Sequence, residues 1–195
     1  MIKFIHMSIA LRKHIGQIVQ LTDEEFEWVL SHFQCKKFQK YQVIIQEGDF
    51  VLHDYFVESG LMKAYRMTSD GKEHILQFAM ENGWITDPDA FHNGTRSNLY
   101  VACLEDSEVL AISMEDREII CGRLQKMEYF FLKTTTACYI TLQNRISCLI
   151  SSKASERYHH LLTQYPGLIQ RIPKTMIASF LGVTRETLSR LDRGN

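Results

Sequence analysis

Four polar residues near the end of the chain, Arg185, Glu186, Ser189 and Arg190, have the spacing of one exposed helix face. Positions i, i+1, i+4 and i+5 of an α-helix lie side by side, so their side chains point the same way. Arginine can donate two hydrogen bonds to guanine, and glutamate can accept one from the amino group of cytosine. We therefore predict that this face reads base edges in DNA.

The residues around this face have the pattern of a helix-turn-helix, which needs two short helices, a tight turn and a shared small core. Pro173 suits the first turn of a helix, and Gly182 can adopt the positive φ of the turn. Thr184 is a suitable N-cap for the second helix. Small or apolar residues occupy the positions where the helices must meet: Ile177, Ala178, Leu181, Val183, Leu188 and Leu191. The alternative is a solvated face on an ordinary terminal helix.

Charge is distributed unevenly along the chain, although the totals nearly balance at 22 Lys or Arg and 23 Asp or Glu. Residues 151–195 contain seven basic and three acidic side chains, whereas the first 150 residues contain 15 basic and 20 acidic ones. A basic tail on an acidic body is typical of a DNA-contacting module attached to a module that does not contact DNA.

Composition excludes several classes of protein. No stretch reaches the roughly 18 uncharged apolar residues of a membrane span, and we expect no membrane partner. The apolar run at the N-terminus soon meets Arg12 and Lys13, which favours a first helix over a signal peptide. The five cysteines include no Cys-x-x-Cys motif, so we expect reduced thiols, no structural metal and a cytoplasmic protein. No phosphate loop or catalytic motif is present, and we expect no enzyme.

The central part of the sequence predicts strands between helices. Thr22 and Glu25 form a capping box at the start of an amphipathic helix that extends to Phe33. Between Cys35 and Ser113, short apolar runs alternate with turn residues at a regular spacing, which predicts an antiparallel roll or barrel. The predicted strands are 43–45, 55–57, 61–67, 74–80, 99–104 and 109–112.

Helical periodicity returns at Met114, and we predict a long helix over 126–150. Residues at alternating steps of four and three form an impure heptad seam, which favours dimerisation through this helix. The alternative is a helix that packs on its own domain. The seam consists of Phe131, Thr135, Cys138, Leu142, Arg145 and Leu149.

This order of parts resembles the Crp/Fnr family of bacterial transcription regulators over nearly the whole chain. Three stretches carry the resemblance: VIIQEGD at 43–49 followed by YFVESG at 55–60, LEDSEVLAI at 104–112, and GVTRETLSR at 182–190. The third stretch is the most specific.

The resemblance implies an α+β chain with an N-terminal antiparallel double-stranded β-roll, jelly-roll-like and flanked by helices. A long dimerisation helix and a C-terminal all-α helix-turn-helix domain with a reduced or absent wing would follow. The expected domains are an effector domain resembling a cyclic-nucleotide-binding domain at 1–125, the dimerisation helix at 126–150 and the DNA-binding domain at 151–195.

The family's base-reading positions match Arg185, Glu186 and Arg190, and Ser189 matches a contact position of the Fnr branch. Without a wing, phosphate contacts would fall to residues such as Arg193. The implied partners are double-stranded DNA, bound at a near-palindromic site by a homodimer, and RNA polymerase. The full set of expected DNA-binding residues is Lys174, Thr175, Thr184, Arg185, Glu186, Thr187, Ser189 and Arg190.

The cassette that cradles a cyclic phosphate in cyclic-AMP-binding members is altered here. Thr86-Asp87 replaces its Gly-Glu pair, and Arg96-Ser97 is displaced by about one residue, which would turn the arginine to the opposite face. These changes argue against cyclic AMP, and we expect no certain cofactor. The candidate effector pocket is formed by Trp84, Thr86, Asp87, Arg96, Ser97, Leu142 and Gln143.

The leading interpretation is thus a homodimeric DNA-binding transcription regulator that is not controlled by cyclic AMP. The alternative is a small-ligand or cyclic-nucleotide binding module whose C-terminal helices contact proteins. Tight ligand binding without salt-dependent DNA affinity would favour the alternative.

Overall fold

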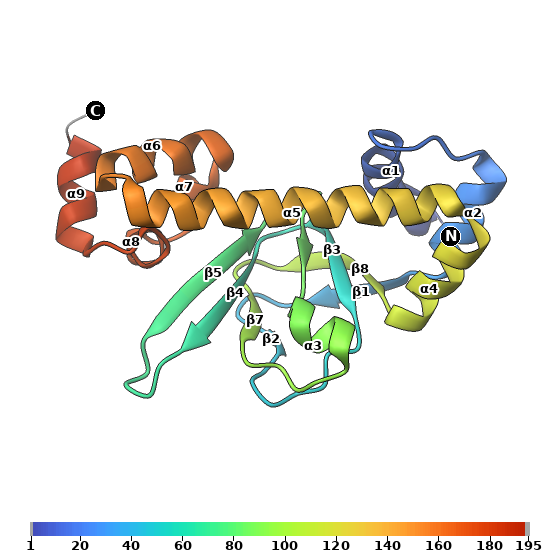
Figure 1. The fold of residues 1–195 in the computed structure, drawn as a ribbon, viewed down its shortest axis with the longest axis horizontal. Helices are drawn as coiled ribbons and strands as arrows, with labels where there is room; N and C mark the ends of the chain where they lie inside the picture. The colour runs from blue at the N-terminus through green and yellow to red at the C-terminus, as the bar shows by residue number, and fades with distance from the viewer. Residues whose placement is uncertain (1, 194–195) are drawn as a thin grey trace.

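Two antiparallel four-stranded sheets form a β-roll beneath a long helix (Figure 1). The computed structural model describes the backbone of residues 2–193 and the side chains of residues 9–191. The first sheet has the order β1 (Gln34–Phe38), β8 (Ser107–Ile112), β3 (Asp54–Ser59) and β6 (Trp84–Ile85). The second has the order β2 (Val43–Ile45), β7 (Tyr100–Cys103), β4 (Met62–Met67) and β5 (Glu73–Ala79).

The inner faces of the two sheets enclose one apolar core. Val57 and Val109, which are paired between β3 and β8, are fully buried there with Val101 of β7. Gly60, at φ +104°, makes the turn between β3 and β4, and a Cβ there would lie 2.7 Å from the carbonyl oxygen of Asp106. Only glycine fits here, so the close approach of this turn to the segment at Asp106 depends on Gly60.

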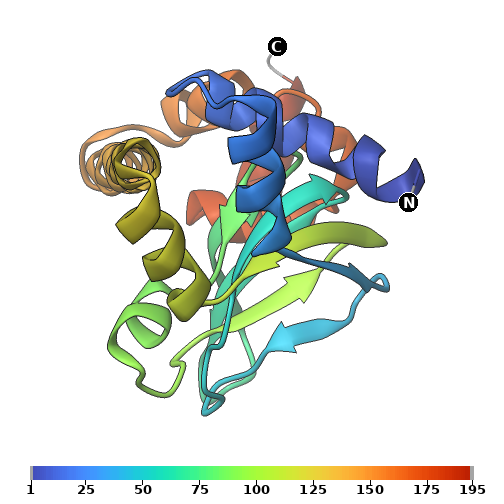
Figure 2. The same cartoon turned by 90° about the vertical axis from the view of Figure 1, so that its right-hand side faces the viewer.

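Three helices cover the outer face of the first sheet at one end of the molecule: α1 (Ile2–Gly16), α2 (Asp23–Ser31) and α4 (Met114–Arg123). Figure 2 shows them beside the end-on view of the long helix. The predicted capping box of α2 is present, since the side chains of Thr22 and Glu25 bond each other's backbone N–H. Their shared core includes Leu11, Phe56 and Phe130, none of which has any exposed surface.

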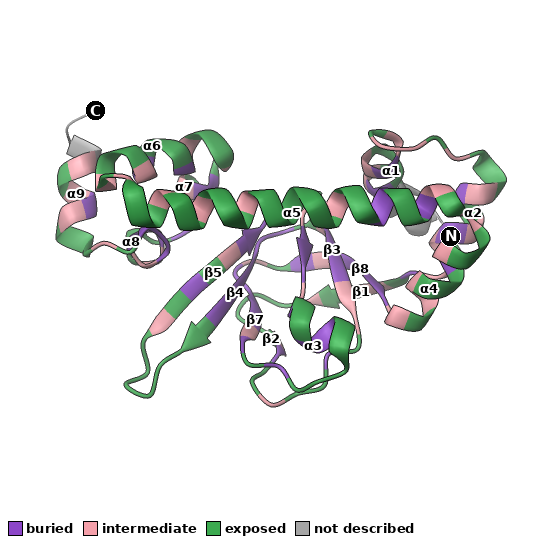
Figure 3. Cartoon of the chain, viewed as in Figure 1, coloured by how far each residue is buried: buried purple, intermediate pink, exposed green. Residues whose placement is uncertain are grey.

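The long helix α5 (Gln125–Ser151) runs across the roll to the C-terminal helices. It is separated from α4 at Leu124, whose extended backbone (φ −124°, ψ 93°) breaks the helical path. Its first turns are buried, but most of its middle and end is exposed (Figure 3). In proteins most of the stability of a helix comes from tertiary packing, so packing along its faces must stabilise α5.

Four helices follow: α6 (Ala154–Gln164), α7 (Leu168–Arg171), α8 (Lys174–Leu181) and α9 (Arg185–Arg193). They share one apolar cluster with the outer face of the second sheet, where Phe78 of β5 packs against Phe180 of α8 with ring centroids 5.1 Å apart. The C-terminal helices are therefore docked on the roll of the same chain.

An ion-pair network reinforces this docking. Arg171 of α7 donates to Glu81, in the turn after β5, at 2.8 and 3.0 Å, and to Glu105, in the turn after β7, at 2.6 and 3.0 Å. Glu81 also accepts the N–H of Gly60 at 3.0 Å. Burial alone would raise the pKa of Glu81, but these hydrogen bonds more than offset it and lower that pKa.

The fold confirms the predicted β-roll, long helix and C-terminal helices. β1, β6 and the short helix α3 (Pro88–Asn93) were not predicted, and the helical region after Met114 is two helices. The domain boundaries at 125 and 150 stay predictions, because one apolar cluster crosses the second of them. Among the described helices, none is long and apolar enough to cross a membrane.

The predicted heptad seam of α5 stays a prediction, because some of its residues contact the same chain and others are exposed. Phe131 is buried against the roll, Cys138 and Leu142 line cavities under α5, and Arg145 bonds to β5. Phe131 and Arg145 thus contact their own chain, as the alternative interpretation expected, whereas Leu142 and Leu149 are 45% and 40% exposed. Steps of three and four residues occur on any face of a helix, so the spacing alone could not separate the two.

Replacing Arg171 with Met should lower the free energy of unfolding by about 1 kcal/mol at neutral pH, since the ion pairs are partly exposed. The lowered pKa of Glu81 means that its stabilisation is present above the unfolded-state pKa and is lost as the pH falls through the folded-state pKa. The free energies of unfolding of the unchanged protein and of Arg171→Met, measured in urea, should therefore become equal in acid. The control Lys37→Met removes the more exposed pair with Glu108. A constant difference at all pH values would contradict this role.

Candidate DNA interface and effector cassette

The helix-turn-helix is formed by α8 and α9. Pro173 precedes α8 as its N-cap, and Gly182 ends the helix in the left-handed region at φ +65°. The N–H of Val183 then donates to the carbonyl of Ala178 at 3.0 Å, which closes the turn. Ile177, Ala178 and Leu181 of α8 and Leu188 of α9 are buried between the helices and the roll, as the sequence pattern predicted.

The start of α9 is fixed by Thr184, whose hydroxyl oxygen accepts the N–H of Thr187 at 3.2 Å. Arg185, Glu186 and Arg190 are exposed on the outer face of α9. The pKa of Glu186 is lowered, first by its own backbone N–H, then by the Thr184 side chain and by the two arginines. The face thus presents an ionised acceptor between two donors, which matches the chemistry needed at a C·G pair.

The other predicted DNA-binding residues lie around this face. Lys174 and Thr175 are exposed at the start of α8, whereas Thr187 and Ser189 are half-buried. The side chain of Arg193 lies outside the described residues. All the described members of the set belong to the end of the molecule formed by α8 and α9, at the left in Figure 1.

The carboxylate of Asp87 is the centre of the altered cassette, and it is 2% exposed. One oxygen accepts the N–H groups of Asp89 (3.1 Å) and Ala90 (3.3 Å) at the start of α3. The other accepts the Ser97 hydroxyl (2.8 Å) and the N–H of Asn98 (3.2 Å). Backbone N–H groups and a hydroxyl that converge in this way form an anion site. In this protein the group that occupies the site is the Asp87 carboxylate of the same chain.

The remaining cassette residues do not complete a phosphate site. Arg96 is exposed, donates to the carbonyl of Gly48 at 2.7 Å and lies 4.5 Å from the ring centroid of Phe50. Gln143 is exposed on another face of α5. Arg96 therefore points away from the cassette, as the displacement by one residue predicted.

Trp84, Thr86 and Leu142 instead line a separate pocket of about 120 Å³ between the roll and α5. Asp54 and Arg117 also line it, and burial raises the pKa of Asp54 to about 6, with Arg117 opposing the rise. The structure thus brings together three of the seven predicted effector residues. Within the described part of the chain, no group of His, Cys, Asp and Glu is placed to hold a metal ion.

Two arginines outside the predicted sites connect the parts of the molecule. Arg171 joins α7 to the roll, and Arg145 of α5 bonds to both β5 and α8. Sequence reasoning placed Arg145 in a dimer seam. An arginine among apolar seam positions was the available signal that this face has another partner.

Comparisons with known proteins agree with this architecture. Residues 35–123 match the cyclic nucleotide-binding domain family. The regulatory protein HlyX of Actinobacillus pleuropneumoniae is 28% identical over 167 residues, which cover 80% of this chain and 69% of that protein. The structure of FixK2 from Bradyrhizobium japonicum superposes with a TM-score of 0.73 at 19% identity, over 83% of each chain.

A further solved structure, a transcriptional regulator of the Crp/Fnr family from Eubacterium rectale, has a TM-score of 0.64 at 16% identity. The match covers 89% of this chain and 82% of that one. The fold and the exposed helix face together define a β-roll regulator with a C-terminal helix-turn-helix. The chain is thus similar to regulators of the Crp/Fnr type over most of its length, and its residues 35–123 match the cyclic nucleotide-binding domain family.

Removing the Asp87 carboxylate should destabilise the fold. Asp87→Ala should lower the free energy of unfolding by about 2–4 kcal/mol, because four donors lose one buried acceptor. The control Asp89→Ala removes an exposed carboxylate of the same short helix and should cost much less. Equal unfolding midpoints in urea for the two variants would contradict the structural role of Asp87.

Proposed function

We propose that the protein is a homodimeric, DNA-binding transcription regulator that reads a near-palindromic site and acts without cyclic AMP. The observation that carries the proposal is the exposed face of α9, where Arg185, Glu186 and Arg190 stand on a buried helix-turn-helix core. Similarity to regulators such as HlyX and FixK2 supports the regulator over an enzyme. Lys174, Thr175 and Thr184 would contact the phosphate backbone, while the α9 face reads bases.

The dimer is proposed to form through a face of α5 that the roll leaves uncovered. This face has a strict alternation of three- and four-residue steps, as in a coiled-coil seam. Leu132, Tyr139 and Ile146 are 61%, 64% and 58% exposed, which is unusual for large apolar side chains unless a partner covers them. The exposed seam consists of Tyr129, Leu132, Thr136, Tyr139, Gln143, Ile146 and Ile150.

Independence from cyclic AMP is supported by the cassette. The Asp87 carboxylate already occupies the N–H and hydroxyl donors around α3, and a second anion there would be repelled. Arg96 is engaged with Gly48 and Phe50 on the outer surface. Cyclic AMP would have to displace a buried carboxylate and reverse an arginine.

Two further features follow from the family rather than from contacts. Regulators of this type act in the cytoplasm, and RNA polymerase is the expected protein partner. The alternative function, a ligand-binding module whose C-terminal helices contact proteins, would leave the ionised Arg–Glu–Arg face of α9 without a DNA role.

Selection of random-sequence duplexes on the purified protein, without added nucleotide, should recover a two-fold symmetric site with half-sites about 34 Å apart. On that site Arg185→Ala should cost about 1–3 kcal/mol of binding free energy and relax the base preference at one position. Lys72→Ala, in the β4–β5 turn, is the charge-matched control. An equal loss on selected and random duplexes would exclude base reading by Arg185.

Ile146→Glu should convert the dimer to a monomer, because two glutamates would face each other in the seam. Sedimentation velocity should show half the mass, and affinity should fall to that of a single half-site. Asn144→Glu places the same charge on the exposed flank of α5 and should leave the dimer intact. A dimer that survives Ile146→Glu would place the interface elsewhere.

A further inference from the structure

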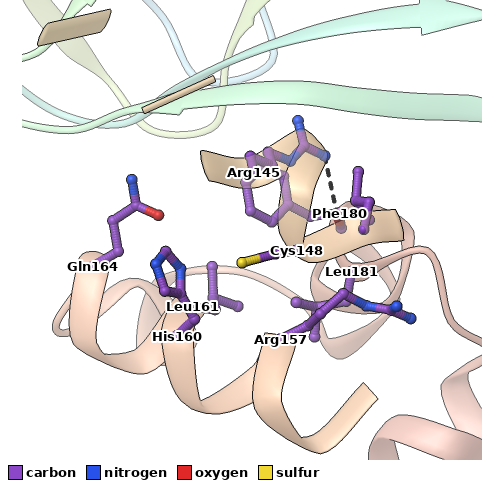
Figure 4. A pocket seen from close by; sticks show the side chains of 9 residues that line it. Arg145, Cys148, Arg157, His160, Leu161, Gln164, Phe180 and Leu181 are labelled. Carbon is purple, nitrogen blue, oxygen red and sulfur yellow. Dashed lines mark hydrogen bonds between the residues drawn. The ribbon is translucent and has the colours of Figure 1, made fainter. Parts of the chain in front are cut away.

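Arg145 joins three parts of the molecule through neutral oxygen atoms. Its guanidinium donates to the carbonyls of Ile75 (2.9 Å) and Leu76 on β5, and to that of Phe180 on α8 (3.0 Å). It also lies 3.8 Å from the ring centroid of Phe180. Figure 4 shows the bond to Phe180 at the C-terminal end of α8, where helix carbonyls lack intrahelical partners.

A bulge in the edge strand makes this contact possible. Ala64 of β4 pairs with Gln77 and Tyr65 pairs with Ile75, so Leu76 is the extra residue of β5. A bulge reorients the local backbone of an edge strand. It allows two consecutive carbonyls to accept hydrogen bonds from one guanidinium.

Within the part of the chain that the structure describes, the guanidinium of Arg145 lacks both a carboxylate partner and an acceptor for one of its N–H groups. Among the described residues it has no carboxylate partner, and its Nε–H is buried without any hydrogen-bond acceptor. Burial lowers the pKa of the Arg145 side chain, since removal from water disfavours its charged form. Arginine binds a carboxylate more strongly than it binds neutral carbonyls, often through two parallel hydrogen bonds.

A cavity of about 180 Å³ lies directly beside this guanidinium, between α5, β5 and the C-terminal helices. Apolar side chains such as Leu76, Leu142 and Phe180 form much of its wall. The neutral polar groups that line it are those of Gln77, Cys138, Thr141, Gln164 and Tyr165. Arg145 is its charged lining residue, and no Asp or Glu belongs to the wall.

A smaller cavity of about 30 Å³ lies next to it and shares Arg145, Gln164 and Phe180 with the first (Figure 4). Its other polar lining residues include Arg157 and His160, and Arg157 also has a buried Nε–H without a partner. Both cavities are therefore lined by basic and neutral groups alone. No residue of the exposed seam of α5 lines either cavity.

We propose that the larger cavity, the junction cavity, binds a small organic carboxylate with an apolar body, and that Arg145 is the partner of its carboxylate. One arginine neutralises one negative charge, which favours a monoanion over a phosphate ester. The apolar wall accommodates a short hydrocarbon chain or a single ring. The site is separate from the cassette that Asp87 fills.

The regulatory consequence rests on the proposed function. A bound carboxylate competes with the carbonyls of Ile75 and Phe180 for the same N–H groups. Turning Arg145 toward the ligand removes its bonds to the edge strand and to α8, and so changes the position of the helix-turn-helix relative to α5. The ligand can shift this equilibrium only by its difference in affinity for the two arrangements.

The test is calorimetric titration of the full-length protein, without DNA, with acetate, butyrate, hexanoate and benzoate and with the amide of each. At least one acid should bind saturably and about tenfold or more tightly than its amide, because only the acid forms a charge-assisted bond with Arg145. Arg145→Gln should abolish the preference for the acid.

Arg145→Gln also removes the contact between α5 and α8, so a second variant is needed. Ala137→Trp fills the junction cavity while it keeps the Arg145 hydrogen bonds, and it should block binding. Asn144→Trp, on the exposed flank of the same helix, should leave binding unchanged. Equal binding of acid and amide, unchanged affinity in Ala137→Trp, or no saturable acid would overturn the proposal. Because no DNA is present, these results do not depend on the duplex selection.

Discussion

A half-buried guanidinium without a carboxylate partner among the described residues is the constraint on which the arrangement of the molecule depends. Arg145 extends from α5 into the junction where the edge strand β5 and helix α8 meet, and it bonds to carbonyls of both. The carbonyl of Phe180 lies in the last turn of α8, where helix carbonyls lack intrahelical donors. The roll, the long helix and the helix-turn-helix thus satisfy one another's polar groups, while Phe78 and Phe180 supply the apolar contact around them.

One face of α5 contacts its own chain, and another is proposed to form the dimer. The first face contacts the roll and α8 of its own chain through Phe131 and Arg145. Another face exposes Leu132, Tyr139 and Ile146 in a regular seam. A rigid helix that carries both faces connects any change at the junction to the proposed dimer axis, because rotation of one face moves the other.

The elements that could be predicted from the sequence are those that local patterns determine. The capping box of α2, the turn at Gly182 and the N-cap at Thr184 each depend on residues within a few positions of one another. The strands with clear apolar runs were predicted for the same reason. The two-residue strand β6 and the polar strand β1 lack such runs, and only pairing with β3 and β8 makes them strands.

The features that could not be predicted depend on contacts between distant residues. Asp87 was interpreted as too short to replace glutamate, and the sequence alone did not reveal that it accepts hydrogen bonds from Ser97 and Asn98, 10 and 11 residues away. The two faces of α5 have the same heptad spacing, so the choice between seam and packing face needs the position of the roll. The role of Arg145 depends on a bulge at Leu76 and on the end of α8, neither of which its neighbours in sequence reveal.

Asp87 and Arg145 differ in whether each charged group could exchange its present partners for others, and this difference bears on regulation. A group can act as a switch only if it has alternative partners of comparable free energy, since a bistable element needs two accessible states. Asp87 fails this requirement, because four donors hold a buried carboxylate that has no equal partner elsewhere. Arg145 meets it, because its present partners are neutral carbonyls and its Nε–H has none. In the proposed mechanism, the Asp87 carboxylate occupies the cassette of the roll, and the charge that could exchange partners is Arg145, whose bond to Phe180 links it to α8.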